Sequence, residues 1–186
     1  MPKSIPNMLS KEYIRACPDF NDYIDWVPGA SMDDFLATLP ADDVSPCAAL
    51  TAAQDYIKSV RHACLNELLA KNGNTAVGLE LTSDNGRLMA IFPEPGKRGG
   101  FRLCNYDVNG PIDHSLFKSA EEAALEAISH GYRTHTPGRL DMLTTLPSWN
   151  RGVKFQALII KTGGNPWPFL EENPGYLDEP ERDIAA

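Results

Sequence analysis

The chain has 186 residues, of which 42% are hydrophobic and 9% aromatic, and its 17 basic and 25 acidic residues give a formal net charge of −8. This length fits one domain with appended segments and excludes two large domains. The negative charge argues against a protein that coats nucleic acid or an anionic membrane with its whole surface.

The charge is distributed unevenly along the chain. Residues 1–46 have a balance of −5, residues 163–186 have another −5, and the middle is left at +2. We therefore expect three parts: an acidic, proline-interrupted helical segment over 1–46, an α+β core over 47–162 and an acidic, aromatic tail over 163–186.

The four cysteines, Cys17, Cys47, Cys64 and Cys104, are far apart and form no CxxC pair. This usage is typical of reduced thiols in a core and predicts a cytoplasmic protein. The N-terminus lacks the apolar stretch of a signal peptide, and no apolar run approaches the ~18 residues that a membrane helix needs. We therefore expect neither secretion nor a membrane partner.

The N-terminal segment predicts short helices broken by prolines. Ser10 is placed to cap a helix that stops near Pro18, and Ser31 is placed to cap another over residues 32–39. The stretch between them, residues 18–29, is expected to be irregular, with an apolar side that packs and an acidic side that stays exposed.

The longest predicted element is an amphipathic helix. Ser45-Pro46 combines a cap with proline at the first helical position, and Gly73 is a typical stop. Apolar residues between them recur at spacings of three and four, so one face of this helix should lie on a sheet or on other helices.

The pattern then changes to the alternation of strands. Ser83-Asp84-Asn85-Gly86 and Asn109-Gly110 are both turn sequences, and each predicts a hairpin. The four strands of the resulting antiparallel meander are expected over residues 75–82, 87–92, 101–108 and 110–117.

The C-terminal part of the core predicts one further strand and more helix. Ser119 and Glu122 form a capping-box signature for a helix that ends at Gly131. A short helix over 138–146 and a fifth strand over 153–161 follow. The predicted fold class is α+β, with N-terminal helices plus an antiparallel meander sheet of about four to five strands and helices packed on one face. The tail is expected to dock without needing to fold.

The acidic ends are the candidate partner-binding surfaces. Aspartates that share a face would present carboxylates to a basic groove, as a phosphate backbone does. In the tail, large apolar residues alternate with acids, as in peptides that dock in hydrophobic grooves with basic rims. The candidate residues are Asp19, Asp22, Asp25, Asp33, Asp34, Asp42, Asp43, Trp167, Phe169, Leu170, Glu171 and Glu172.

These surfaces predict a non-enzymatic protein that binds another macromolecule, most specifically a protein with a basic groove. A more specific form of this hypothesis is an acidic inhibitor of a nucleic-acid-binding machine. Such inhibitors occur among anti-CRISPR and other counter-defence proteins of mobile genetic elements. The alternative is a purely structural role for both ends. The aspartates would then belong to helix caps and first turns, and the tail would be a strap that packs Trp167 onto the core of the same chain.

A second hypothesis is direct nucleic-acid binding by the central sheet. Its candidate residues are Arg87, Lys97, Arg98 and Arg102, with the acidic ends as autoinhibitory covers. The loop around Lys97 is not a P-loop, because it leads into a strand and not a helix. Alternatively, these basic residues belong to a solvent-exposed turn, where their charges only maintain solubility.

A third hypothesis is an enzyme that uses Cys104 and His114, which could lie on paired strands of the second hairpin. Asp113, His114, His130 and His135 could also gather around a metal, but their spacing matches no metal-ligand motif. No catalytic or cofactor motif is present, so neither a cofactor nor a resident metal is expected.

Overall fold

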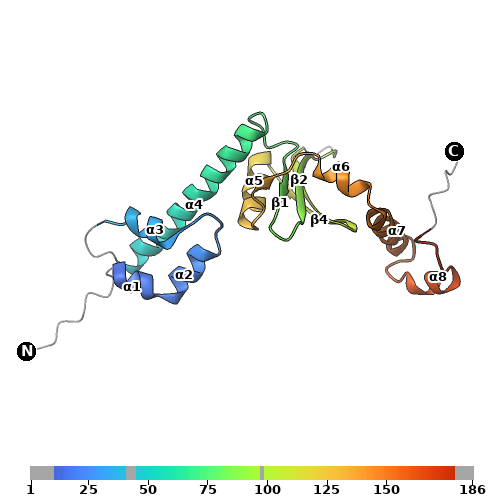
Figure 1. Cartoon of the computed structure of the whole chain (residues 1–186), viewed down its shortest axis with the longest axis horizontal. Coiled ribbons are helices and arrows are strands. Elements are labelled where there is room, and N and C mark those ends of the chain that lie inside the picture. The colour runs from blue at the N-terminus through green and yellow to red at the C-terminus, as the bar shows by residue number, and fades with distance from the viewer. Residues whose placement is uncertain (1–10, 41–44, 97–98, 179–186) are drawn as a thin grey trace, which may run out of the picture.

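The computed structural model describes residues 11–40, 45–96 and 99–178, and it shows an elongated molecule with helices at both ends and a sheet between them (Figure 1). The helices are α1 (Lys11–Ala16), α2 (Pro18–Asp25), α3 (Met32–Thr38), α4 (Pro46–Lys71), α5 (Ala120–Ser129), α6 (Arg139–Thr144), α7 (Pro147–Lys161) and α8 (Trp167–Glu172). The strands are β1 (Glu80–Thr82), β2 (Leu88–Pro93), β3 (Phe101–Asp107), β4 (Gly110–Phe117) and β5 (Thr134–His135).

The three N-terminal helices pack around the first half of α4. Their shared core contains Ile24 and Phe35 together with Ala49, Ala53 and Ile57 of α4. The expected irregular stretch over 18–29 is wrong for its first eight residues, which form α2. Proline in the first turn and apolar residues at helical spacing favour a helix there over an open loop.

The long helix α4 connects this helical cluster to the sheet. Its predicted start is confirmed, because the Ser45 hydroxyl accepts a hydrogen bond from the Ala48 amide at 3.3 Å. The first half of α4 lies in the N-terminal core, whereas Leu65 and Leu68 in the second half pack under the sheet. One continuous helix therefore belongs to two hydrophobic clusters.

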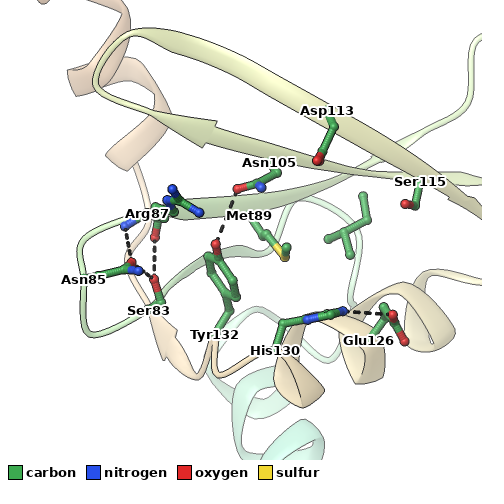
Figure 2. A pocket seen from close by; sticks show the side chains of 11 residues that line it. Ser83, Asn85, Arg87, Met89, Asn105, Asp113, Ser115, Glu126, His130 and Tyr132 are labelled. Carbon is green, nitrogen blue, oxygen red and sulfur yellow. Dashed lines mark hydrogen bonds and ion pairs between the residues drawn. The ribbon is translucent and has the colours of Figure 1, made fainter.

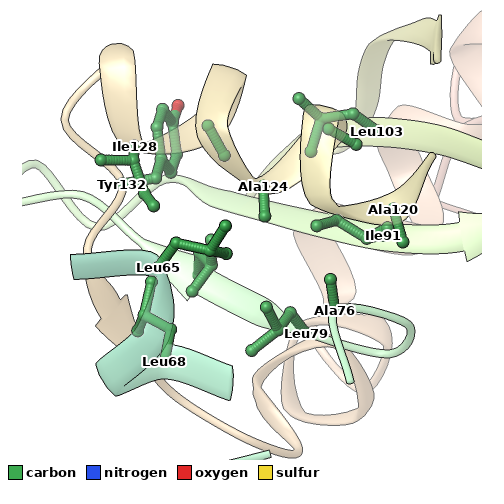
Figure 3. Close-up of a cluster of buried hydrophobic side chains, with 13 residues drawn as sticks. Leu65, Leu68, Ala76, Leu79, Ile91, Leu103, Ala120, Ala124, Ile128 and Tyr132 are labelled. Atoms are coloured by element: carbon green, nitrogen blue, oxygen red, sulfur yellow. The ribbon is translucent and has the colours of Figure 1, made fainter. Parts of the chain in front are cut away.

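The five strands form one antiparallel sheet in the order β4-β3-β2-β1-β5. One face packs against α4 and α5 in the largest core, where Ile91 and Leu103 lie opposite Ala124 (Figure 3). Helix α5 has the predicted cap, since the Ser119 hydroxyl accepts from the Glu122 amide at 3.1 Å. The predicted α+β class is confirmed.

Part of the opposite face is covered by α6 and α7. Leu88, Leu143 and Trp149 form a small buried cluster there, and Tyr106 stacks on Trp149 with 5.6 Å between ring centroids. Side chains alternate between the faces of a strand, so Leu88 points away from its neighbour Met89, which packs against the core of α4 and α5.

The predicted fifth strand over 153–161 is wrong, because these residues form the C-terminal part of α7. A short apolar run is ambiguous between helix and strand, and Pro147 at the first helical position decides for a helix. The fifth strand is instead β5, whose His135 pairs with Leu81 of β1. The first predicted strand is also shorter than expected and begins only at Glu80.

The tail folds back on α7 as far as Asp178. Trp167 lies against Phe155 with 5.8 Å between ring centroids, and Arg151 pairs with Asp178 at 3.4 Å. The tail therefore docks as expected, and part of it is the helix α8.

Candidate binding surfaces

The outer face of α2 combines acidic and aromatic side chains. Ile24 and Val27 are buried against the other helices, and Phe20 stacks on Phe35 with 6.4 Å between ring centroids. Helical periodicity turns the intervening residues outward. We call this surface the acidic aromatic face, and it consists of Asp19, Asp22, Asp25 and Trp26, with Tyr23 at its border, where Tyr23 also lines a cleft against α4.

The acidic aromatic face is open to solvent. Trp26 is 81% exposed and Tyr23 is 39% exposed. The three aspartates are exposed, and none of them forms an ion pair with another residue that the structure describes. The surface thus presents uncompensated negative charge beside a tryptophan that contributes little to the protein's own core.

The other predicted acids of the N-terminal segment have simpler surroundings. Asp33 forms a 2.9 Å ion pair with Arg15, and Asp34 donates its backbone N–H to the Ser31 hydroxyl at 3.1 Å. Both are exposed residues in the first turn of α3, where negative charge is favourable. Asp42 and Asp43 lie outside the described residues.

The predicted anchors of the tail are partly used within the chain. Phe169 packs edge-on against Tyr176 with 5.0 Å between ring centroids, and the Lys161 ammonium lies 5.7 Å from the Phe169 centroid. Phe169 and Leu170 are half-buried, whereas Glu171, Glu172 and Trp167 remain exposed. The arrangement matches an intramolecular strap with an acidic outer edge.

The structure does not bring the basic candidates Arg87 and Arg102 into one patch. Arg87 lines a cleft on the side of the sheet that α5 covers, whereas Arg102 lies on the opposite face, since its neighbour Leu103 belongs to the core under α5. The Nε and Nη2 groups of Arg102 donate to the two oxygens of the Glu94 carboxylate, at 2.9 and 3.0 Å. Lys97 and Arg98 are outside the described residues.

Cys104 and His114 are directly opposite each other on β3 and β4, so their side chains share a sheet face. Burial raises the pKa of the Cys104 thiol and outweighs the hydrogen bond from Tyr106, which lowers it. A nucleophilic cysteine needs the thiolate, so this environment favours an unreactive thiol. The expectation of core thiols is wrong for Cys47, which is exposed, and all four cysteines are free.

The histidines and Asp113 do not converge on a metal site. Within the described part of the chain, no group of three or more His, Cys, Asp or Glu side chains is arranged to hold a metal ion. Asp113 and His130 line the cleft beside α5, and His114 lies on the other face of the sheet. His135 lies on β5 at the other edge of the sheet from β4.

The sequence predicts no single site from the polar residues that line the cleft beside α5, although it separately suggests Arg87 for nucleic-acid binding and Asp113 and His130 for a metal (Figure 2). It has a volume of about 380 Å³ and is lined by the β1–β2 turn, by β2 to β4 and by the end of α5. Asn105, Asp113 and Ser115 occupy strand positions on the face that α5 covers elsewhere. A strand face that packs under a helix is ordinarily apolar. Polar residues at alternate positions of these strands are therefore the sequence signal that could have indicated the cleft.

No protein-family model matches the chain, and neither a curated protein nor a solved structure is significantly similar to it. None of the helices in the described residues is both long and apolar enough to span a bilayer. The α+β fold by itself specifies no activity, so the basis for a function is the chemistry of the surfaces described above.

Proposed function

We propose that this chain is a non-enzymatic binding protein that recognises a basic surface of another protein through the acidic aromatic face of α2. The observation that carries the proposal is the 81% exposure of Trp26 beside Asp22 and Asp25. Tryptophan is one of the three residue types enriched among those that dominate protein–protein binding energy.

The charges on this face support a cationic partner. The carboxylates of Asp19, Asp22 and Asp25 carry no ion pair within the described residues, so a partner's lysines and arginines would meet unneutralised acids. Complementary charge accelerates encounter and excludes acidic competitors, while burial of Trp26 supplies apolar contact area. The two contributions act on one helix face and need no rearrangement of the core.

The sharper form of the proposal is an inhibitor that occupies the basic groove of a nucleic-acid-binding protein. A row of exposed carboxylates on a small acidic chain resembles the charge of a nucleic-acid backbone in such a groove. Anti-CRISPR and other counter-defence proteins belong to this class. The free cysteines support a reducing cytoplasm as the compartment in which it works.

The test uses two exposed tryptophans, one at the end of α2 and one at the start of α8, helices that lie at opposite ends of the molecule (Figure 1). Trp26 is 81% exposed and Trp167 is 62% exposed. Full-length protein is used to capture partners from a nuclease-treated lysate of the source cells, and each captured protein is identified by mass spectrometry and purified. Its affinity is then measured by calorimetry for wild type, Trp26→Ala and Trp167→Ala.

We expect Trp26→Ala to weaken binding about 30-fold, which corresponds to a typical hot-spot loss of about 2 kcal/mol. The control variant Trp167→Ala should bind as wild type does. Equal affinity of wild type and Trp26→Ala, or capture of no protein at all, would overturn the proposal. Competition between the partner's nucleic acid and this chain separates the inhibitor from a simple binding module.

A further inference from the structure

The polar cleft beside α5 has the features of a small-molecule site that is independent of the acidic aromatic face. The strands β3 and β4 continue past the point where α5 ends, and this leaves a hollow of about 380 Å³ between them and the C-terminus of the helix. Figure 2 shows the side chains of Tyr132, Asn105 and Asp113 gathered around it.

The floor of the cleft is partly apolar and partly hydrogen-bonding. Met89 and Leu103 supply apolar surface, and the Tyr132 hydroxyl donates to the Asn105 side-chain oxygen at 3.4 Å. This long contact directs the Asn105 oxygen toward Tyr132, and the Asn105 amide nitrogen has no hydrogen-bond partner within the described residues. A ligand carbonyl over the floor could therefore accept a hydrogen bond from Asn105.

Two opposite charges line the cleft without neutralising each other. Arg87 lies at one end, next to the β1–β2 turn, and Asp113 projects from β4. Neither forms an ion pair with any residue that the structure describes, whereas Glu126 and His130 are paired with each other at 3.1 Å. Within the described part of the chain, Arg87 and Asp113 are thus a cation and an anion without an ion-pair partner, whereas the Glu126 carboxylate is hydrogen-bonded to His130.

The sheet register sets the separation of these charges. Asp113 pairs with Asn105, Asn105 pairs with Met89, and Arg87 precedes Met89 by two residues. Two strand spacings of about 4.8 Å and two residues of about 3.4 Å place the α-carbons of Arg87 and Asp113 roughly 12 Å apart. Figure 2 shows the Arg87 guanidinium and the Asp113 carboxylate apart from each other, with the Asn105 amide between them.

We infer that this cleft binds a short zwitterion whose charges are several atoms apart, and that a dipeptide is the chemical class that fits it. The dipeptide carboxylate pairs with Arg87 and its ammonium group with Asp113. Its central peptide carbonyl accepts from the Asn105 amide, and its small side chains lie on Met89 and Leu103.

The test is a titration of the full, isotope-labelled chain with L-alanyl-L-alanine, followed by NMR shifts of the backbone amides. We expect saturable shifts centred on Asn105, Asp113 and Tyr132. N-acetyl-alanyl-alanine amide, which lacks both charges, should give none. A zwitterion without a peptide group, 6-aminohexanoate, should bind at least several-fold more weakly than the dipeptide.

Variants assign the two charged contacts. Arg87→Met and Asp113→Asn should each weaken dipeptide binding at least tenfold, and both residues are exposed, so folding should be unaffected. Matched controls are Asp84→Asn in the same turn and Arg133→Met, neither of which lines the cleft. Absence of saturable shifts, equal binding of the blocked dipeptide, or sensitivity to only one of the two charge variants would overturn the inference.

Discussion

A β-carbon on Gly152 would lie 1.7 Å from the carbonyl oxygen of Asn109. The backbone of α7 therefore rests directly on the backbone of the β3–β4 turn. One helical turn earlier, the Ser148 hydroxyl donates to the Val108 carbonyl at 2.6 Å, and one turn later the Gln156 side chain donates to a carbonyl of the same hairpin. Ser148, Gly152 and Gln156 are four residues apart and therefore lie on one face of α7. This face attaches the C-terminal helices to the sheet.

Gly152→Ala should destabilise the protein strongly, by about 3 kcal/mol, because a methyl group cannot enter a contact between two backbones without shifting one of them. Urea unfolding followed by circular dichroism measures the loss. Gly96→Ala is the control, since its added methyl group would meet the Glu94 carboxylate only at an ordinary contact distance of 3.4 Å. A change below about 0.5 kcal/mol for Gly152→Ala would contradict the close contact of α7 with the turn.

Cys104 should react slowly with iodoacetamide at neutral pH. Burial raises its thiol pKa, whereas Cys47 is exposed near the start of α4. Because the thiolate is the reactive form, we expect Cys47 to be alkylated first. Site-resolved mass spectrometry over a time course gives both rates. Faster alkylation of Cys104 than of Cys47 would instead support the Cys104 and His114 pair as an activated nucleophile.

The free energy of unfolding should fall as the pH rises above about 9. Burial raises the pKa of the Cys64 and Cys104 thiols above their ordinary 9.0, and it raises the pKa of Tyr106 above its ordinary 10.0. In this range the unfolded chain ionises before the folded one, so alkali favours unfolding. Urea midpoints between pH 7 and pH 10.5 test this expectation.

The double variant Cys64→Ala and Cys104→Ala serves as the control for that measurement. It removes two of the three groups, so its stability should decline less steeply over the same pH range. A wild-type stability that stays constant or rises above pH 9 would show that these groups are not protected from ionisation by the fold.

Neutralising the acids of α2 should weaken partner binding and reduce its dependence on salt. The triple variant Asp19→Asn, Asp22→Asn and Asp25→Asn removes three exposed charges while leaving Trp26 in place. The logarithm of affinity against salt concentration should have a shallower slope than for wild type. A control triple variant that neutralises exposed acids elsewhere, at Asp84, Glu121 and Asp141, should keep the wild-type slope.

Local chemistry explains which elements the sequence could predict. Ser31, Ser45 and Ser119 each accept the backbone hydrogen bond that their positions predict, at 3.1, 3.3 and 3.1 Å. The turn at Asn109-Gly110 joins β3 and β4 as expected. Caps and tight turns depend on residues adjacent in the chain, so one sequence is enough to find them.

Elements that depend on tertiary contacts were harder to predict. The run over 153–161 is apolar enough for a buried strand, but it continues the helix that begins at Pro147 and packs on the hairpin. The two-residue strand β5 exists because its chain passes beside β1, which no periodicity in a two-residue segment can show.

The candidate surfaces show the same limit. The charge distribution along the sequence indicates the aspartates of α2, but their association with Trp26 depends on a helix where the sequence predicts an irregular stretch. Arg87 and Arg102 could have been assigned to opposite faces by counting alternate positions along the predicted hairpins. The ion pair between Arg102 and Glu94 could not have been predicted in this way, because the loop between β2 and β3 sets the distance between the two side chains.

The most direct test of the proposed function is hydrogen–deuterium exchange of the full-length chain, alone and in complex with the purified partner. We expect slower exchange on binding in α2 and at Trp26, with α7 and α8 unchanged, because the acidic aromatic face lies on α2. Protection confined to α7 and α8, or to the open face of the sheet, with none in α2, would contradict the assignment of the partner to this face.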